Sequence, residues 1–235
     1  GGIYMNPYSS LDASGLTIMG NEAYSGGGLY LLNAQGSIIN SSITDNLSAG
    51  PGGGAYLNGT FILKNVLIAD NTAWVGGGIH YNWISQTNNT ALDLINVTIA
   101  NNIAEAGEGN GNAIYYDKFM GECAGECEAS QSAPHSIINS IILGDMAMVY
   151  NCSSGCGEYM DQLFIDNSYI EWETDPTYFL DFSYENSNNL LGWIMGSPLL
   201  KDPDDGDYTL HSTSPCIDAG TPTYDWGTLE VEEFE

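Results

Sequence analysis

Short apolar runs alternate with Asn, Gly and Ser along most of the chain, and this alternation returns in register. The clearest copy is the stretch 39–46, Ile-Asn-Ser-Ser-Ile-Thr-Asp-Asn. With Asn40 as the reference position, equivalent residues fall at Asn65, Asn96, Asn139 and Asn167, with Gly15 in an earlier copy. The pattern indicates a repeat protein, so the repeat has to be interpreted before any single motif.

Two further positions follow each reference residue at a constant distance. Three residues on, the residue is always isoleucine: Ile18, Ile43, Ile68, Ile99, Ile142 and Ile170. Six residues on, the series is polar: Asn21, Asn46, Asn71, Asn102, Asp145 and Glu173. Six identical β-branched residues in register indicate a position that stacks on itself in the fold.

The repeat predicts strands, because its apolar runs are short and show no helical periodicity. A unit of about 25 residues cannot bury its own apolar face, so neighbouring units have to stack, with equivalent strands about 4.8 Å apart. Asparagines in register can then hydrogen-bond along the stack through their side-chain amides. The predicted fold is an all-β, right-handed parallel β-helix of about six to seven coils. Leucine-rich and ankyrin solenoids lack support, because their leucine or helix signatures are absent.

Glycine runs mark a second landmark of each repeat. Gly26–Tyr30 (Gly-Gly-Gly-Leu-Tyr) returns at 52–56, at 76–80 with His80 in place of the tyrosine, and in altered form at 111–115. Glycine allows positive φ and close approach of neighbouring chains, so these runs predict corners that precede a strand. We expect the tyrosines and His80 to form a structural stack rather than a catalytic site. Since residues 1–4 match 27–30, we also expect the chain to be part of something longer.

The distance from this aromatic landmark to the next reference residue grows in the later repeats. It is 9–11 residues in the first three repeats, then 16 and 24, and 17 if Tyr150 is the landmark of its repeat. Insertions on one face of a solenoid commonly mark an interaction surface. Aromatic rings in or beside these insertions could stack on neutral sugars or contact a partner, although packing in the core or among the loops is the favoured interpretation: Trp74, Tyr81, Trp83 and Tyr116.

The charge of the chain excludes several partners. It has three lysines, no arginine and thirty acidic residues, for a net charge of −27. Such a surface repels nucleic acid and anionic lipid, and no apolar run is long enough to predict a membrane span. Other copies, other domains of a longer chain and surface glycans remain as expected partners.

The cysteines and sequons fit an exported protein. Two pairs have the same spacing, Cys123 with Cys127 and Cys152 with Cys156, and we interpret them as disulfides, with a four-cysteine zinc site as the alternative. Cys216 stands alone. Of six Asn-x-Ser/Thr sequons, Asn58 and Asn88 are the expected glycosylation sites, because they lie outside the asparagine series.

The repeat pattern ends near residue 175. We therefore divide the chain into β-helix coils at 1–175 and, at 176–235, a last distorted coil, a C-terminal cap and an acidic tail. Caps are needed because a terminal coil exposes strand edges. The acidic turn in this region suggests weak Ca²⁺ coordination by Asp202, Asp204, Asp205 and Asp207.

The C-terminal motifs suggest a family. The run 202–210, Asp-Pro-Asp-Asp-Gly-Asp-Tyr-Thr-Leu, is followed at 214–220 by Ser-Pro-Cys-Ile-Asp-Ala-Gly. Together with the Gly-Gly-x-Ile/Leu-Tyr and Ile-x-Asn repeats, this ending resembles secreted bacterial right-handed parallel β-helix repeat proteins and, more loosely, the polymorphic outer-membrane protein repeats of adhesins. The resemblance covers about residues 1–222 and implies the fold and export, but no single activity.

An enzyme on this scaffold would need suitable side chains. A uronate lyase needs cationic groups, and the three lysines form no cluster in the sequence. A glycoside hydrolase needs two carboxylates, for which Asp45 and Asp70 are the weak candidates, with a solvated turn as the alternative. The sequence thus favours a non-catalytic extracellular or cell-surface stalk, fibre or adhesin segment that presents its loop-bearing face. The alternative is a carbohydrate-active enzyme or a glycan-binding module for neutral polysaccharide.

Overall fold

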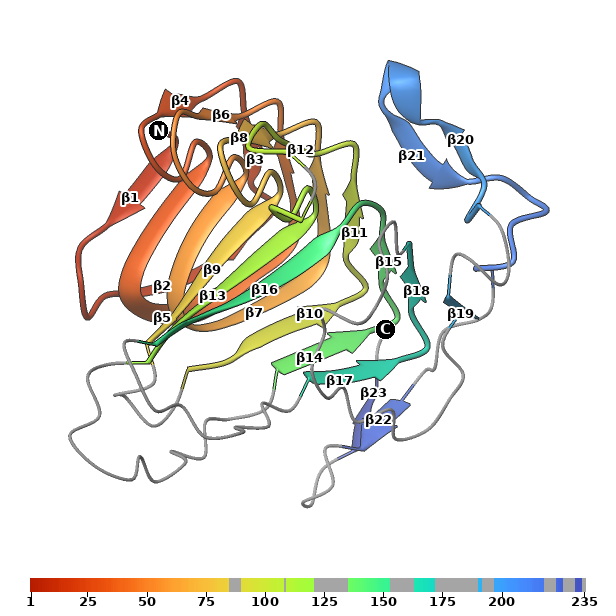
Figure 1. The fold of residues 1–235 in the computed structure, drawn as a ribbon. Coiled ribbons are helices and arrows are strands. Elements are labelled where there is room, and N and C mark those ends of the chain that lie inside the picture. The colour runs from red at the N-terminus through yellow and green to blue at the C-terminus, as the bar shows by residue number, and fades with distance from the viewer. Residues whose placement is uncertain are drawn as a thin grey trace.

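The structure is a computed structural model that describes residues 1–84, 90–107, 109–120, 135–152, 163–171, 190–191, 197–217, 223–225 and 231–233. Apart from one 3-10 turn, η2 (Pro203–Asp205), the regular elements in these ranges are strands (Figure 1). No helix in them is long and apolar enough to cross a membrane. The prediction of an all-β fold is confirmed.

Strands recur in the same order in successive repeats. The first group begins directly after the glycine runs and consists of β1 (Ile3–Met5), the start of β5 (Leu29–Thr44) and of β7 (Ala55–Ala69), β9 (Ile79–Ile84), β13 (Ile114–Met120) and β16 (Met146–Cys152). The second group precedes the reference positions and consists of β2 (Ser10–Ser14), the middle of β5 and β7, β10 (Leu92–Ile95), β14 (His135–Ile138) and β17 (Leu163–Asp166).

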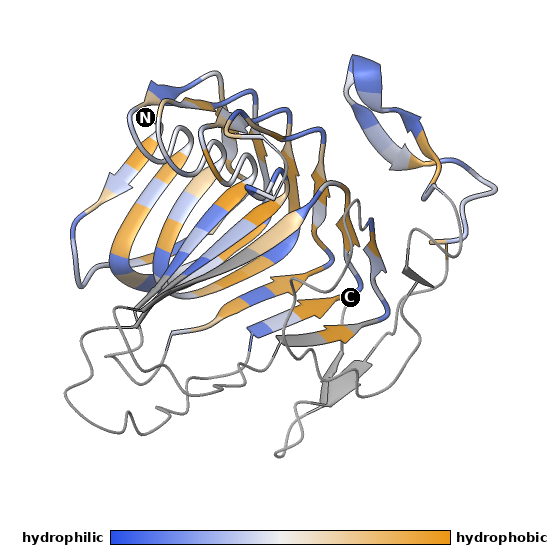
Figure 2. Ribbon diagram, viewed as in Figure 1, coloured by the Kyte–Doolittle hydropathy of each residue, from blue (hydrophilic) through white to orange (hydrophobic). Residues whose placement is uncertain are grey.

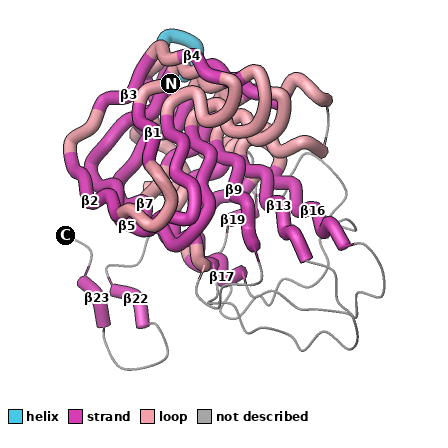
Figure 3. The backbone as a smooth tube through the Cα atoms, turned by 90° about the vertical axis from the view of Figure 1, so that its left-hand side faces the viewer, coloured by secondary structure: helices cyan, strands magenta, loops and turns pink. Residues whose placement is uncertain are grey.

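Two more groups complete the repeat. The third follows the reference positions and consists of β3 (Thr17–Met19), the ends of β5 and β7, β11 (Thr98–Ala100), β15 (Ile141–Ile142), β18 (Tyr169–Ile170) and β19 (Leu190–Leu191). The fourth is a separate small sheet of β4 (Glu22–Ala23), β6 (Leu47–Ser48), β8 (Thr72–Ala73) and β12 (Ile103–Ala104). In all four groups, equivalent strands of successive repeats pair in parallel, as the layered arrows of Figure 1 and the adjacent strands of Figure 3 show.

The isoleucine series forms the centre of the core. Ile43 pairs in register with Ile18 on one side and with Ile68 on the other, and the row continues through the later repeats to Ile170. All six of these isoleucines are at most 5% exposed. Leucines and isoleucines of the first and second groups join the same hydrophobic cluster (Figure 2). Burial of each such side chain contributes about 1.5–3 kcal/mol, so the row is a main source of stability.

The polar reference residues form corners between the second and third groups. The five reference asparagines have φ between 48° and 55°, and Gly15 has φ of 70°. Asn and Gly tolerate this left-handed conformation better than other residues do, which explains their place in the repeat. The glycine runs are corners too: Gly26, Gly52, Gly76 and Gly111 have φ between 61° and 73°.

The pairing of β13 with β16 shows that Tyr150 is not the equivalent of the landmark tyrosines. Tyr115 of β13 pairs with Ala147 of β16, whereas Tyr150 pairs with Lys118. Ala147 is therefore the landmark of its repeat, and the distance to Asn167 is longer than the sequence suggested. The insertions still leave from one edge, because β9, β13 and β16 end side by side and β10, β14 and β17 begin side by side.

The C-terminal part continues the stack and then returns along its side. β19 pairs with β18 and extends the third group. Next, β20 (Leu200–Asp202) and β21 (Asp207–Leu210) form an antiparallel hairpin, and β22 (Thr223–Asp225) and β23 (Val231–Glu233) form another. The first hairpin contacts corner residues Asp70 and Asn101, so it lies against the side of the repeats rather than over their end.

Candidate ligand-binding site

Asp45 and Asp70, the predicted carboxylate pair, lie at a second row of corners, where the third group of strands ends. Both have positive φ, 56° and 57°, and the equivalent residues Gly20 and Asn101 have φ of 67° and 52°. Asp45 is exposed and Asp70 is partly buried. The left-handed backbone accounts for Asp, Asn or Gly at this position without a catalytic role.

The carboxylate of Asp70 is already bound by another part of the chain. The Tyr208 hydroxyl donates a hydrogen bond to Asp70 Oδ2 at 2.5 Å. Asn101 Nδ2 donates to the carbonyl oxygen of Pro203 and to Tyr208 Oη, both at 3.3 Å. Burial and the Asp70 carboxylate raise the pKa of the Tyr208 hydroxyl, which therefore stays a donor. These contacts tie the β20–β21 hairpin to the corner.

A groove separates this hairpin from the row of reference asparagines. Its volume is about 400 Å³, and it is shallow and widely open to solvent. The floor comes from three successive repeats and the wall from the hairpin: Asn40, Ser41, Asn65, Val66, Leu67, Asn96, Thr98, Gly206, Asp207, Tyr208 and Thr209. Asp70 contacts Tyr208 of the groove wall, but neither Asp45 nor Asp70 lines the groove itself.

The asparagines on the groove floor form a ladder. Asn65 Nδ2 donates to Asn40 Oδ1 at 2.9 Å, and Asn96 Nδ2 donates to Asn65 Oδ1 at 3.1 Å. This is the amide stacking that the sequence predicts for residues in register. Each amide has two N–H donors and two acceptor sites, so a single bond along the ladder leaves part of it available to a ligand.

The aromatic residues expected to bind a ligand have different environments. Tyr81 is fully buried, Tyr116 is 2% exposed, and both rings pack with His135 in the core. The expectation of a ligand-binding surface is thus corrected for these two, because each occupies the inward position of its strand next to an outward His80 or Tyr115. Trp74 is 55% exposed, on the corner after β8, and the Trp83 side chain lies outside the described residues.

The polar groups of this aromatic cluster are buried among apolar side chains. Tyr81 Oη donates to the carbonyl oxygen of Gly59 at 2.6 Å, and the backbone N–H of Leu92 donates to His135 Nδ1 at 2.9 Å. The Tyr116 hydroxyl is buried without a partner among the described residues. Burial raises the pKa of both tyrosine hydroxyls, so they remain protonated.

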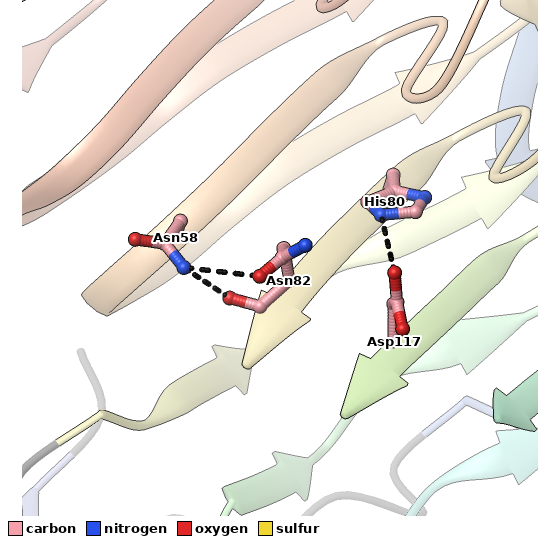
Figure 4. A network of polar contacts seen from close by, with 4 residues as sticks. All are labelled: Asn58, His80, Asn82 and Asp117. Carbon is pink, nitrogen blue, oxygen red and sulfur yellow. Dashed lines mark hydrogen bonds and ion pairs between the residues drawn. The ribbon is translucent and has the colours of Figure 1, made fainter. Parts of the chain in front are cut away.

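The predicted aromatic stack exists and lies on the outer face of the first strand group. Neighbouring rings of Tyr4, Tyr30, Tyr56, His80 and Tyr115 are 4.9–5.4 Å apart between centroids and nearly parallel. Burial raises the pKa of Tyr56 to about 12 and lowers that of His80 to about 4. His80 is therefore neutral near pH 7, and its 3.9 Å contact with Asp117 (Figure 4) is a polar contact rather than an ion pair.

Asn58 is corrected as a glycosylation site. Its side chain is 1% exposed, and Asn58 Nδ2 donates to the carbonyl oxygen and Oδ1 of Asn82 at 2.7 and 3.3 Å (Figure 4). Asn58 Oδ1 accepts a bond from the backbone N–H of Asn33. A glycan on this nitrogen would break the bonds to Asn82. Asn88, the second predicted site, lies outside the described residues.

The predicted disulfide and calcium residues receive little structural support. Cys123, Cys127 and Cys156 lie outside the described residues, as does the side chain of Cys152, whereas Cys216 is a free, partly exposed thiol. In the acidic turn, Asp202, Asp204 and Asp205 are exposed, and Asp207 Oδ1 accepts bonds from the backbone and hydroxyl of Thr209. No group of three or more metal-ligating side chains is found within the described ranges, so calcium binding stays a prediction.

No comparison identifies a family. No protein-family model matches the chain, and searches of curated proteins and of solved structures gave no match. The chemistry of the site therefore has to be argued from its own residues.

Sequence reasoning missed the contact between Tyr208 and Asn101 that holds the groove wall against the repeats. Tyr208 and Asn101 lie 107 residues apart in the chain and meet only because the hairpin returns along the stack. Their sequence signals were present, since Asn101 occupies a corner position and Tyr208 belongs to the C-terminal motif, but neither signal indicates the other.

Proposed function

We propose that the chain is a right-handed parallel β-helix and acts as a non-catalytic segment of an exported protein, a stalk, fibre or adhesin that presents one face to a partner. The support is the uninterrupted register of its rows. Isoleucines, asparagines and aromatic rings each stack on their equivalents through four or more repeats, which is the arrangement expected of a rigid solenoid.

The insertions support a presenting role. They leave the stack from one edge, beside β9, β13 and β16, so a rigid scaffold would hold them on the same side. Export is supported by the resemblance of the C-terminal motifs to secreted β-helix proteins and by the net charge of −27, which suits a saline exterior.

The carboxylates at the corners favour a structural role over catalysis. Asp45 and Asp70 have the backbone conformation that their position requires, and Asp70 is occupied by Tyr208. A general acid or nucleophile needs a free carboxyl group facing the substrate. The two aspartates therefore support a structural role for these corners.

Surface labelling and a substrate panel test the proposal together. Antibodies against residues 29–104 should label intact cells of the source as strongly as permeabilised cells, and the purified chain should release no reducing ends from neutral polysaccharides. Labelling that requires permeabilisation would contradict export. Turnover abolished by Asp70→Asn or Asp45→Asn would instead support the second candidate, a glycoside hydrolase, which the closeness of these corners to an open groove favours.

A further inference from the structure

We propose that the groove between the reference asparagines and the β20–β21 hairpin is a binding site for a neutral saccharide. The proposal concerns this groove alone and holds whether or not the chain is a structural segment. It rests on the shape of the hollow, on its hydrogen-bonding groups and on the charge around it.

The groove has room for one or a few sugar rings lying along the surface of the repeats. Its volume of about 400 Å³ lies within the range of small-molecule sites. The floor is rigid, because its residues lie in β5, β7 and β11 or, for Asn96, just before β11, and these strands pair in register across three repeats. The wall is fixed by the bonds from Tyr208 to Asp70 and from Asn101 to Pro203. A site held in this way binds without a large ordering cost.

The asparagine ladder supplies donors and acceptors in a regular row. Equivalent residues of neighbouring strands are about 4.8 Å apart, so three amides extend along the floor. Asn40 Oδ1 accepts from Asn65, but the position before Asn40 in the stack is Gly15, which has no side chain to continue the ladder. No bond from Asn40 Nδ2 is found among the described residues, so both of its N–H groups are open to a ligand. Sugar hydroxyls both donate and accept, as amides do.

The remaining lining residues fit a sugar in other ways. Leu67 provides apolar surface for the C–H face of a ring, and the hydroxyl of Thr98 adds a donor and an acceptor. Asp207 is the charged residue of the lining; its Oδ1 is taken by Thr209. The lining contains no Lys or Arg, and the chain has a net charge of −27. Phosphate, sulfate and uronate ligands are therefore disfavoured.

The direct test is an NMR titration of the whole chain with neutral oligosaccharides. The probes are hexasaccharides of β-1,4-glucan, β-1,4-xylan, β-1,4-mannan and α-1,4-glucan, with a uronate hexasaccharide and a basic peptide as comparisons. We expect at least one neutral probe to shift the side-chain amide signals of Asn40, Asn65 and Asn96, and the uronate to shift none. If no neutral probe shifts them, or if only the basic peptide does, the proposal is overturned.

Variants then locate the site. Asn40→Gly keeps the left-handed backbone, as Gly15 shows, and removes the open amide. Combined with Thr98→Val, it should weaken binding about tenfold, because two hydrogen bonds are lost. The matched control is Asn33→Gly, an exposed left-handed asparagine of the same strand outside the groove, which should leave affinity unchanged. Unchanged affinity of the double variant, checked for intact folding by circular dichroism, would place the saccharide elsewhere and overturn the proposal.

Discussion

Asn102 Oδ1 accepts two hydrogen bonds from Asn71, one from its backbone N–H and one from its side-chain Nδ2, both at 3.0 Å. The same pair of bonds joins Asn46 to Asn71 and Asn21 to Asn46. The side chains of Asn46, Asn71 and Asn102 are nearly fully buried, and Asn21 is partly buried. This inner ladder satisfies polar groups in the interior, where an unpaired amide costs about 1–3 kcal/mol.

Replacement of Asn71 should destabilise the protein strongly. Asn71→Ala removes the donor to Ile43 and Asn102 and the acceptor for Asn46, so we expect a loss of about 3 kcal/mol or more. Asn71→Asp keeps the acceptor for Asn46 but places a buried carboxylate oxygen against the acceptor oxygens of Ile43 and Asn102, so it should cost at least as much. Chemical denaturation measures both. A clearly smaller loss for Asn71→Asp would show that the acceptor for Asn46 matters more than the two donated bonds.

Glycine at a crowded corner should resist substitution. A Cβ at Gly54 would lie 2.6 Å from the carbonyl oxygen of Gly78, in the next repeat, so Gly54→Ala should cost about 2–3 kcal/mol. Gly20 is the control, because a Cβ there meets nothing within 4 Å and its equivalents are Asp45 and Asp70. Gly20→Asn should change stability by less than about 0.5 kcal/mol. Thermal unfolding of both variants measures the difference in stability. Similar losses of stability for Gly54→Ala and Gly20→Asn would refute the prediction.

Acid should weaken the aromatic stack through His80. Burial lowers its folded pKa from 6.5 to about 4, so the unfolded chain binds the proton first. The free energy of unfolding is therefore unaffected by His80 above pH 6.5 and falls as the pH drops from 6.5 to 4. Below pH 4 the whole contribution, about 3 kcal/mol, is lost. The groups that face the ring are Tyr56 and Tyr115 above and below it and Asp117 at its edge.

The control for this prediction is His80→Tyr, which restores the residue found at the equivalent positions. Denaturation curves at pH 7.5, 5.5 and 4.0 should show a smaller loss of stability for the variant than for the parent chain. If both chains lose stability in parallel, carboxylate protonation elsewhere accounts for the effect.

Loss of the Tyr208 hydroxyl should release the hairpin without unfolding the repeats. Its bond to the Asp70 carboxylate is worth about 1.5–3 kcal/mol, and the other bonds between hairpin and stack found in the described part of the chain are the two weaker ones donated by Asn101. In Tyr208→Phe, hydrogen exchange at 200–210 should accelerate, whereas exchange at 29–44 should not change. Asp70→Asn should give the same pattern more weakly, since a neutral acceptor remains. Acceleration throughout the chain would mean that the hairpin stabilises the whole fold.

Positions that recur could be predicted from the sequence. The isoleucine series is buried, the reference asparagines are left-handed corners, and the aromatic rings stack, because each environment is repeated and selects the same residue type. The inward orientation of Tyr81 had a signal as well: it occupies the position of Leu57, which is fully buried in the preceding repeat.

Contacts made once could not be predicted in the same way. The bond from Tyr208 to Asp70 spans 138 residues and has no counterpart in another repeat. Asn58 looked accessible as a sequon, and only the pairing of β7 with β9 shows that Asn82 covers its amide. Such contacts depend on the path of the chain between repeats rather than on local pattern.

The two asparagine ladders have opposite polarity. In the inner ladder each amide donates toward the next repeat, from Asn46 to Asn71, whereas in the outer ladder it donates back, from Asn65 to Asn40. Their side-chain dipoles therefore oppose one another along the stack and largely cancel. At the first repeats, one ladder ends in an acceptor, at Asn21, and the other ends in a donor, at Asn40. Only the acceptor lies in the first repeat, because Gly15 precedes Asn40 in the stack, so a unit added there in register would have to donate a hydrogen bond to Asn21.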